Sequence, residues 1–178
     1  MRLKAERRWK DLRAALTTMP GGRVWLRCAL VYGLFLACAA PIGLWFGFLR
    51  PATPHLGPSE MASGGILLFL QPAFVEEVVF RGLLLPRDAS SRSRGHVVFM
   101  AVVALTLYVA SHPLNAALFR PSVLSLFASP VYLTLTTLLG LTCTAAYFIS
   151  RSIWPPVAIH WLTVVTWIWF LGGQALLC

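Results

Sequence analysis

The clearest deficit of this 178-residue sequence is in charged side chains. Asp, Glu, Lys and Arg make up 12% of the residues, whereas a soluble domain carries about 25%. Hydrophobic residues make up 58%, and the mean hydropathy is +0.74. This composition is typical of membrane proteins. Because one spanning helix uses roughly 20 residues, the length allows about five or six spans and leaves no room for a soluble domain.

Other features are also missing. The four cysteines lack metal-type spacing, and three of them lie in apolar runs, so we interpret them as small buried hydrophobes and expect no disulfide. The first apolar run is too long for a cleaved signal peptide and ends without an A-x-A site. No internal repeat or low-complexity segment is present.

Acidic residues are scarce as well, with 6 against 15 basic residues, and the net charge is +9. The basic residues cluster in the N-terminal segment and in one later loop. We interpret this excess as a topology signal and as attraction to anionic lipid headgroups. A nucleic-acid partner is therefore not expected.

The apolar residues form five long runs, each of a length that can span a bilayer. These runs cover about 24–49, 61–85, 96–118, 124–149 and 153–173. Short loops rich in Pro, Gly, Ser and Arg separate them. The sequence therefore predicts an all-α, polytopic membrane bundle of about five transmembrane helices, with residues 24–178 as the membrane-embedded domain.

Residues 1–23 precede this domain. Apolar residues recur at three- and four-residue spacing between basic ones, namely Ala5, Trp9, Leu12 and Leu16. This pattern predicts a short basic amphipathic helix that lies on the membrane surface and ends at Pro20.

The positive charges predict the orientation of the bundle. With five spans, the N-terminal segment, the 86–95 loop and the loop with Arg151 fall on one side, and the less basic loops with Arg50 and Arg120 fall on the other. The N-terminus is therefore expected in the cytoplasm and the C-terminus outside.

Three ionisable residues lie well inside the second run, Glu76, Glu77 and Arg81. Each ionised side chain at the bilayer centre costs roughly 2.5–3.5 kcal/mol on insertion scales. Glu77 and Arg81 are one helical turn apart and can pair, whereas Glu76 points about a quarter-turn away. A structural ion pair therefore accounts for Glu77 and Arg81 and leaves Glu76 free for chemistry.

Two histidines lie deep in later runs, His112 in the third and His160 in the fifth. Pro113 follows His112 directly, so we expect the third helix to kink or break there and His112 to face a hydrated cavity. Because each of these polar residues would be costly facing lipid, the cheapest arrangement brings both carboxylates, Glu76 and Glu77, and both histidines into one pocket.

Such a pocket favours hydrolysis of an amide. A carboxylate and a histidine can hold and deprotonate water, and a second histidine can donate to an oxyanion. Two alternatives stay open at this point: a zinc site with Glu76, His112 and His160 as ligands, and a proton relay in a small transporter. No Ser or Cys adjoins these groups as a convincing nucleophile.

The motifs resemble those of a known family. Residues 76–81, EEVVFR, match its EExxxR motif, and residues 108–112, YVASH, resemble its FxxxH motif with Tyr in place of Phe. His160 resembles the histidine of its HxxxN-type motif. The chain resembles, over about residues 70–172, the CPBP family of glutamic intramembrane proteases, which includes CAAX prenyl endopeptidases and bacteriocin-processing and Abi proteins.

The resemblance implies a role for each matching residue. Glu76 would be the general base that activates water, with His112 holding the water and His160 stabilising the oxyanion. Glu77 and Arg81 would hold the geometry. No cofactor is implied, although zinc was once assigned to the family.

One departure concerns the oxyanion. The position four after His160, usually Asn, is Val164, which cannot donate a hydrogen bond. Asn115, Thr163 and Tyr108 are candidates to supply the missing polar group.

The resemblance also implies a substrate and a location. The chain is short and looks more like sortase-like bacterial members, so we expect a multi-pass protein of the plasma (inner) membrane that cuts a membrane-anchored protein or peptide, for instance at a C-terminal sorting or anchor tail. The alternatives are a zinc-dependent metalloprotease with the same residues and a non-catalytic immunity or scaffold protein, the latter favoured by Val164.

Overall fold

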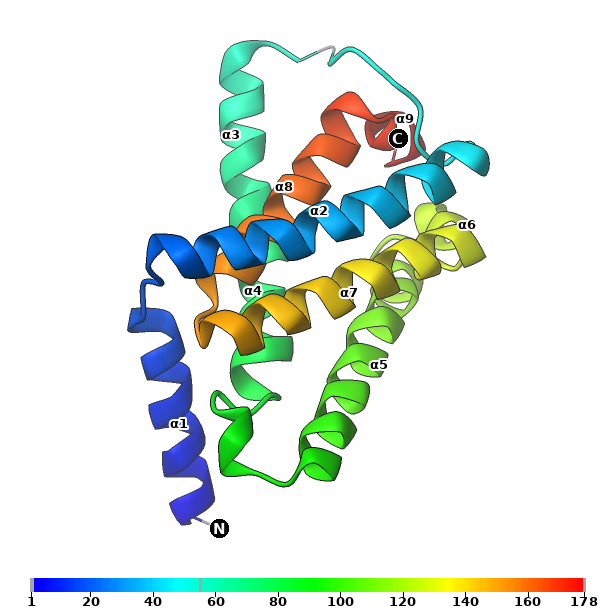
Figure 1. The fold of residues 1–178 in the computed structure, drawn as a ribbon. Coiled ribbons are helices and arrows are strands. Elements are labelled where there is room, and N and C mark those ends of the chain that lie inside the picture. Colours follow the sequence, from blue (N-terminus) through cyan, green and yellow to red (C-terminus); the bar gives the residue numbers. More distant parts are fainter. Residues whose placement is uncertain (1, 55, 178) are drawn as a thin grey trace.

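The computed structural model describes residues 2–54 and 56–177, and within this part of the chain the regular structure is entirely helical. Figure 1 shows the helices packed as a bundle with α1 projecting from one end. The elements are α1 (Arg2–Thr17), α2 (Gly22–Trp45), α3 (Pro58–Leu68), η1 (Phe69–Phe74), α4 (Val75–Glu77), η2 (Val78–Leu83), η3 (Ala89–Ser91), α5 (Arg94–Phe119), η4 (Pro121–Val123), α6 (Leu124–Phe127), α7 (Pro130–Ser150), α8 (Trp154–Phe170) and α9 (Gly173–Leu177). The all-α membrane bundle is thus confirmed.

In the described part of the chain, three helices are long and apolar enough to cross a membrane, α2, α5 and α7. They correspond to the first, third and fourth predicted runs. Large hydrophobic side chains are exposed along them, as expected for surfaces that face lipid. Of the two remaining runs, the second differs from the prediction of one continuous helix, and the fifth forms one shorter helix.

The second run is interrupted at Gln71. Its φ of −139° and ψ of 122° are extended, so the helix that starts at Pro58 does not continue directly into the segment with the acidic pair. Pro72 explains the break, because a proline lacks the N–H and disfavours helical backbone in the residue before it. The fifth run forms α8, which has 17 residues and is therefore short for a straight span.

α5 runs without interruption through Pro113 to Phe119, so the expectation of a break near His112 is wrong, while a kink stays a prediction. Pro113 lacks the N–H that would bond to the carbonyl of Val109, four residues earlier. In the turn before the proline, the Ser111 hydroxyl donates to the Tyr108 carbonyl at 2.7 Å, and Nδ1 of His112 lies 2.8 Å from the same oxygen.

The N-terminal helix α1 packs on the bundle through its apolar side. Leu12 is buried and lies against Gly82, whereas Trp9 is exposed. The Arg8 guanidinium donates to the carbonyl of Leu83 at 2.8 Å. The predicted helix is present. The helical bundle covers part of its apolar face, which we expected to lie on lipid. The side chains of Lys4, Ala5 and Arg7 lie outside the described part of the chain.

The positively charged segments meet at one end of the bundle. Arg87 donates to the Thr18 hydroxyl at 2.9 Å and to the Arg151 carbonyl at 3.0 Å. Asp88 pairs with Arg151 at 3.1 Å, and hydrogen bonds from Ser90 lower the pKa of Asp88. These contacts tie the end of the N-terminal segment to the two basic loops, so the three segments lie at the same end of the bundle. The side of the membrane that this end faces stays a prediction.

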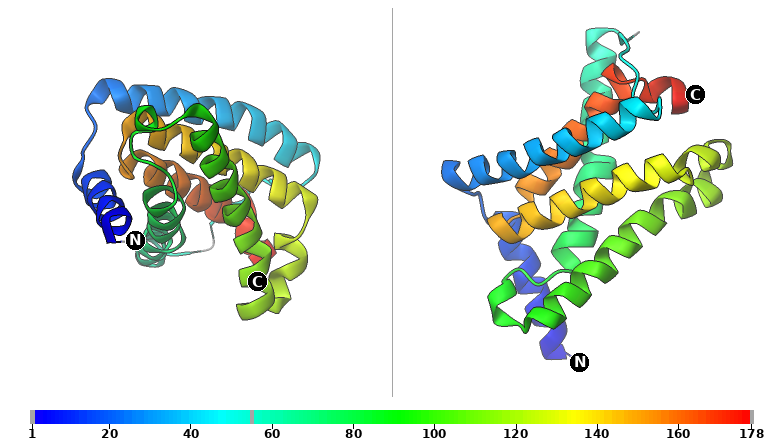
Figure 2. Two further views of the ribbon diagram at one scale, coloured as in Figure 1. Left: turned by 90° about the horizontal axis from the view of Figure 1, so that it is seen from below. Right: turned by 45° about the vertical axis from the view of Figure 1, so that its right-hand side comes forward.

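Helices α2 and α7 lie side by side in all views (Figures 1 and 2). Helix α5 approaches α7 closely at Gly140. A Cβ at this position would lie 2.6 Å from Leu105 and 2.9 Å from the Tyr108 ring. Only glycine therefore permits this α5–α7 spacing, and it leaves the Gly140 carbonyl within reach of the polar cluster described next.

Candidate active site

The centre of the molecule holds a buried ion pair. Nη1 of Arg81 lies 3.0 Å from Oε1 of Glu77, one helical turn away, as the four-residue spacing predicts. Nη2 of Arg81 donates to the Gly140 carbonyl of α7 at 2.9 Å. Both side chains are almost fully buried. Because the two charges neutralise each other, both can be buried, whereas an unpaired charge here would be strongly destabilising.

His160 of α8 joins this pair. Its Nδ1 lies 2.9 Å from the same Oε1 of Glu77. A carboxylate oxygen that already accepts from Arg81 can only accept, so Nδ1 of His160 carries the proton of this hydrogen bond. The bond fixes the ring orientation, as carboxylates do for histidines in catalytic sites.

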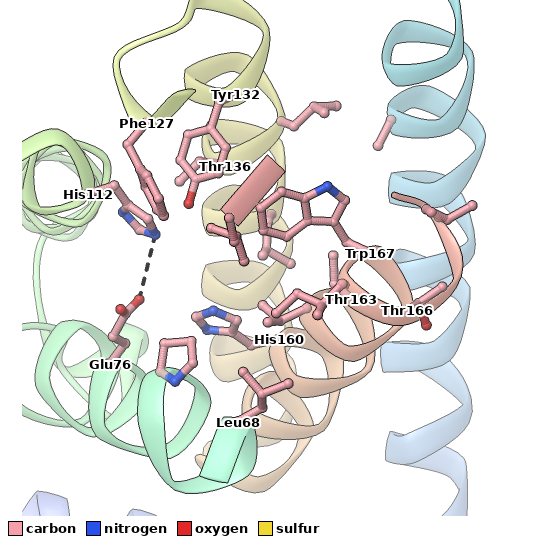
Figure 3. A pocket seen from close by; sticks show the side chains of 18 of the residues that line it. Leu68, Glu76, His112, Phe127, Tyr132, Thr136, His160, Thr163, Thr166 and Trp167 are labelled. Atoms are coloured by element: carbon pink, nitrogen blue, oxygen red, sulfur yellow. Dashed lines mark ion pairs between the residues drawn. The ribbon is translucent and has the colours of Figure 1, made fainter. Parts of the chain in front are cut away.

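Glu76 faces a different partner, His112 of α5. Oε2 of Glu76 lies 3.9 Å from Nε2 of His112 (Figure 3). The Tyr108 carbonyl 2.8 Å from Nδ1 of His112 accepts from that nitrogen, which leaves Nε2 to face the carboxylate. A separation of 3.9 Å is longer than a direct hydrogen bond, and a water molecule beside both groups can bond to each of them.

One pocket of about 590 Å³ joins these groups, and Glu76, His112 and His160 all line it. Figure 3 shows Glu76 and His112 on one side of this space, with His160 to the right of Glu76. Glu77 and Arg81 do not line it and lie behind the site. The structure thus brings the three predicted catalytic side chains into one pocket, while their roles stay predictions.

The three candidates for polar support also line the pocket. The Thr163 hydroxyl donates to the Ile159 carbonyl at 2.8 Å and lies 3.3 Å from the Tyr32 hydroxyl. Asn115 is exposed. Tyr108 is buried, with its ring against those of His112 and His160. Val164 also lines the pocket, so an apolar side chain lies at the position where the resemblance led us to expect an Asn donor.

Comparison with known proteins agrees with this arrangement. A family model described as type II CAAX prenyl endopeptidase Rce1-like matches residues 58–166, which is more than half of the chain and includes Glu76, His112 and His160. The chain belongs to this Rce1-like family. No curated protein and no solved structure matches it.

Membership of the Rce1-like family defines the general activity. The chain is an integral membrane protein with the endopeptidase activity of that family, and its substrate is a membrane-associated protein. The family match covers α3 to most of α8, whereas α1 and α2 precede it.

Zinc was an alternative expectation for this Rce1-like site. Within the described residues, no three His, Cys, Asp or Glu side chains are grouped so that they could hold a metal ion. Glu76 lies near His112, and Nδ1 of His160 bonds to Glu77. A reaction without a metal stays a prediction.

Some residues that line the pocket were not predicted from the sequence. Aromatic side chains form one wall of the pocket, with ring centroids 4.7 Å apart for Phe127 and Tyr132 and 6.1 Å apart for Tyr132 and Trp167. Nothing in the sequence distinguishes them from core aromatics. Gln71 also lines the pocket, and here a signal existed, since it is a polar residue in an apolar run, next to Pro72 and five positions before Glu76.

Proposed function

We propose that this Rce1-like protein is a glutamic-type intramembrane endopeptidase that activates water with Glu76 and His112. The observation that carries the proposal is the 3.9 Å separation of Oε2 of Glu76 and Nε2 of His112 at a pocket that also holds His160. This spacing suits one water molecule that bonds to both groups.

Peptide hydrolysis at this site would proceed in two steps. The water oxygen bonds to the carbonyl carbon, the C=O π electrons move to the carbonyl oxygen, and Glu76 takes one proton from the water. The oxyanion then re-forms the C=O bond, the C–N bond breaks, and Glu76 returns the proton to the leaving amine.

His160 is placed to stabilise the oxyanion. To donate from Nε2 while Nδ1 donates to Glu77, the ring must carry both protons. Glu77 then provides the negative charge beside the imidazolium, and Arg81 fixes the position of Glu77. Glu77 and Arg81 are accordingly positioning residues.

The finer assignments belong to the same proposal. We propose a metal-free reaction, which is supported by the lack of three grouped metal-ligating side chains among the described residues. We also propose a membrane-anchored substrate that is cut in or near its membrane segment, such as an anchor tail. The orientation that fits the basic end of the bundle has this end in the cytoplasm of a bacterium. The lipid bilayer is the second partner.

A non-catalytic immunity or scaffold protein is the second candidate, and the specific observation in its favour is Val164 in the pocket. A proton-coupled transporter has no such support.

A cleavage assay in membranes tests the proposal. The protein is co-expressed with tail-anchored exported proteins, and tail loss is read by mass spectrometry. We expect cleavage by the wild type and none by Glu76→Gln, while Glu6→Gln, the same change on the exposed side of α1, cleaves normally. Absence of cleavage by the wild type across the substrate set would favour the non-catalytic candidate.

A further inference from the structure

A small number of buried polar atoms in the described part of the chain have no hydrogen-bond partner, and several of them lie at the candidate site. They include Oε2 of Glu76, Oε2 of Glu77 and the hydroxyl of Tyr108. A buried polar group without a partner costs about 1–3 kcal/mol, so each such group calls for an explanation. For Glu76 the proposed water is the partner. The Tyr108 hydroxyl needs one of its own.

Tyr108 sits between the two histidines. Its ring meets that of His112 edge-on at 4.9 Å and that of His160 edge-on at 6.0 Å. The Arg81 guanidinium lies over its face, 4.5 Å from the ring centroid. Only 1% of the residue is exposed, yet it contributes to the pocket lining. The ring is thus held on several sides, as a preorganised donor requires.

Other donors near the site are less suitable. Thr163 already donates to the Ile159 carbonyl, and Asn115 is exposed. Val164 has no donor. Nε2 of His160 can donate only when the ring carries both protons, because Nδ1 holds the proton shared with Glu77. A phenol carries its proton throughout.

We infer that the Tyr108 hydroxyl donates a hydrogen bond to the oxyanion of the scissile peptide, beside His160. This assignment rests on the proposed peptidase function and deepens it, because it makes Tyr108 a catalytic residue. It also explains why a tyrosine is buried here with an unpartnered hydroxyl, since its acceptor arrives with the substrate and develops full charge only in the transition state.

The test is steady-state kinetics of the full-length protein in lipid nanodiscs. Removal of one oxyanion donor lowers kcat by about 10²–10³-fold. We expect Tyr108→Phe to lower kcat by about 10²-fold with KM unchanged, because the ring and its packing are kept. The matched control is Tyr147→Phe, since Tyr147 also has a buried, unpartnered hydroxyl but lies in a core cluster outside the pocket lining. This control should retain kcat.

A rescue experiment separates donation from packing. Val164 is one helical turn after His160 and lines the pocket, so an amide there can donate in place of the phenol. Val164→Asn in the Tyr108→Phe background should recover at least tenfold in kcat. A peptide phosphinate, which carries a tetrahedral anion, should bind Tyr108→Phe about 10²-fold more weakly than the wild type, whereas substrate KM stays constant.

The inference is overturned if Tyr108→Phe keeps kcat within twofold of the wild type, or if Tyr147→Phe loses as much. In either case, cleavage by the wild type and its loss in Glu76→Gln would leave the peptidase proposal intact. Failure of the wild type to cleave would instead remove the proposed function together with this inference.

Discussion

His160 and Glu77 are joined by a hydrogen bond of 2.9 Å across 83 positions of sequence, and both side chains are buried. The carboxylate oxygen in this bond also accepts from Arg81. Glu77 therefore links its ion pair with Arg81 to the imidazole of His160, which lines the pocket.

This link predicts that Glu77→Gln lowers activity without abolishing it. A glutamine can still orient the ring but cannot balance an imidazolium, so we expect kcat to fall about 10–100-fold, as for other partners that orient catalytic histidines. Michaelis–Menten kinetics of the purified variant measure the effect. Full activity of Glu77→Gln would contradict an electrostatic role of Glu77 in the reaction.

Arg81→Met should mainly affect stability. It leaves the Glu77 carboxylate buried and short of its cation, which costs about 3–5 kcal/mol. Thermal unfolding in detergent should show a clearly lowered Tm. The double variant Glu77→Gln/Arg81→Met should recover part of the loss, since it removes the unpaired charge. A double variant less stable than Arg81→Met would contradict this account.

His112→Gln should lose about 10²–10⁴-fold in kcat, because a glutamine amide cannot take up a proton as the imidazole can beside Glu76. His96→Gln is the matched control, on the same helix but with an exposed side chain near its start. Equal losses in both variants would point to damage of α5 instead of loss of a catalytic group.

Gly140→Ala should destabilise the bundle. The added Cβ would meet Leu105 and the Tyr108 ring at 2.6 and 2.9 Å, and overpacking of this kind costs about 1–3 kcal/mol. Gly33→Ala on α2 is the control, because no atom lies within 4 Å of its Cβ position. Chemical denaturation of both variants compares the two sites. A Gly140→Ala variant as stable as Gly33→Ala would show that α5 and α7 adapt.

A chelator should leave activity unchanged. The geometry of Glu76, His112 and His160 does not provide a zinc ligand set among the described residues, so we expect the same cleavage rate with and without EDTA or 1,10-phenanthroline. Loss of cleavage that added zinc restores would move the mechanism to a metal.

The sequence predicted the placement of several polar side chains better than the path of the chain. The four-residue spacing predicted that Glu77 pairs with Arg81. The free-energy cost of charges in lipid predicted that Glu76 and the two histidines lie at one pocket. These inferences depend on helix geometry and desolvation, which act locally.

The helix boundaries were harder to predict, because a proline can either end a helix or lie within a continuous one. Pro72 accompanies a break at Gln71, whereas Pro113 lies within an unbroken α5. The local sequence around a proline does not distinguish these two outcomes. The hydrogen bond between Glu77 and His160 was likewise not predicted, since residues so far apart in sequence meet only through the packing of α8.

The close approach of α5 and α7 at Gly140 has a mechanical consequence. The Gly140 carbonyl accepts from Arg81, Arg81 holds Glu77, and Glu77 holds the ring of His160. A displacement of α7 relative to the second run would pull on this series of bonds and turn the imidazole. The spacing of the helices in the bilayer and the orientation of the His160 ring are therefore coupled. We expect a change in membrane thickness or lateral pressure that moves α7 to change the cleavage rate as well.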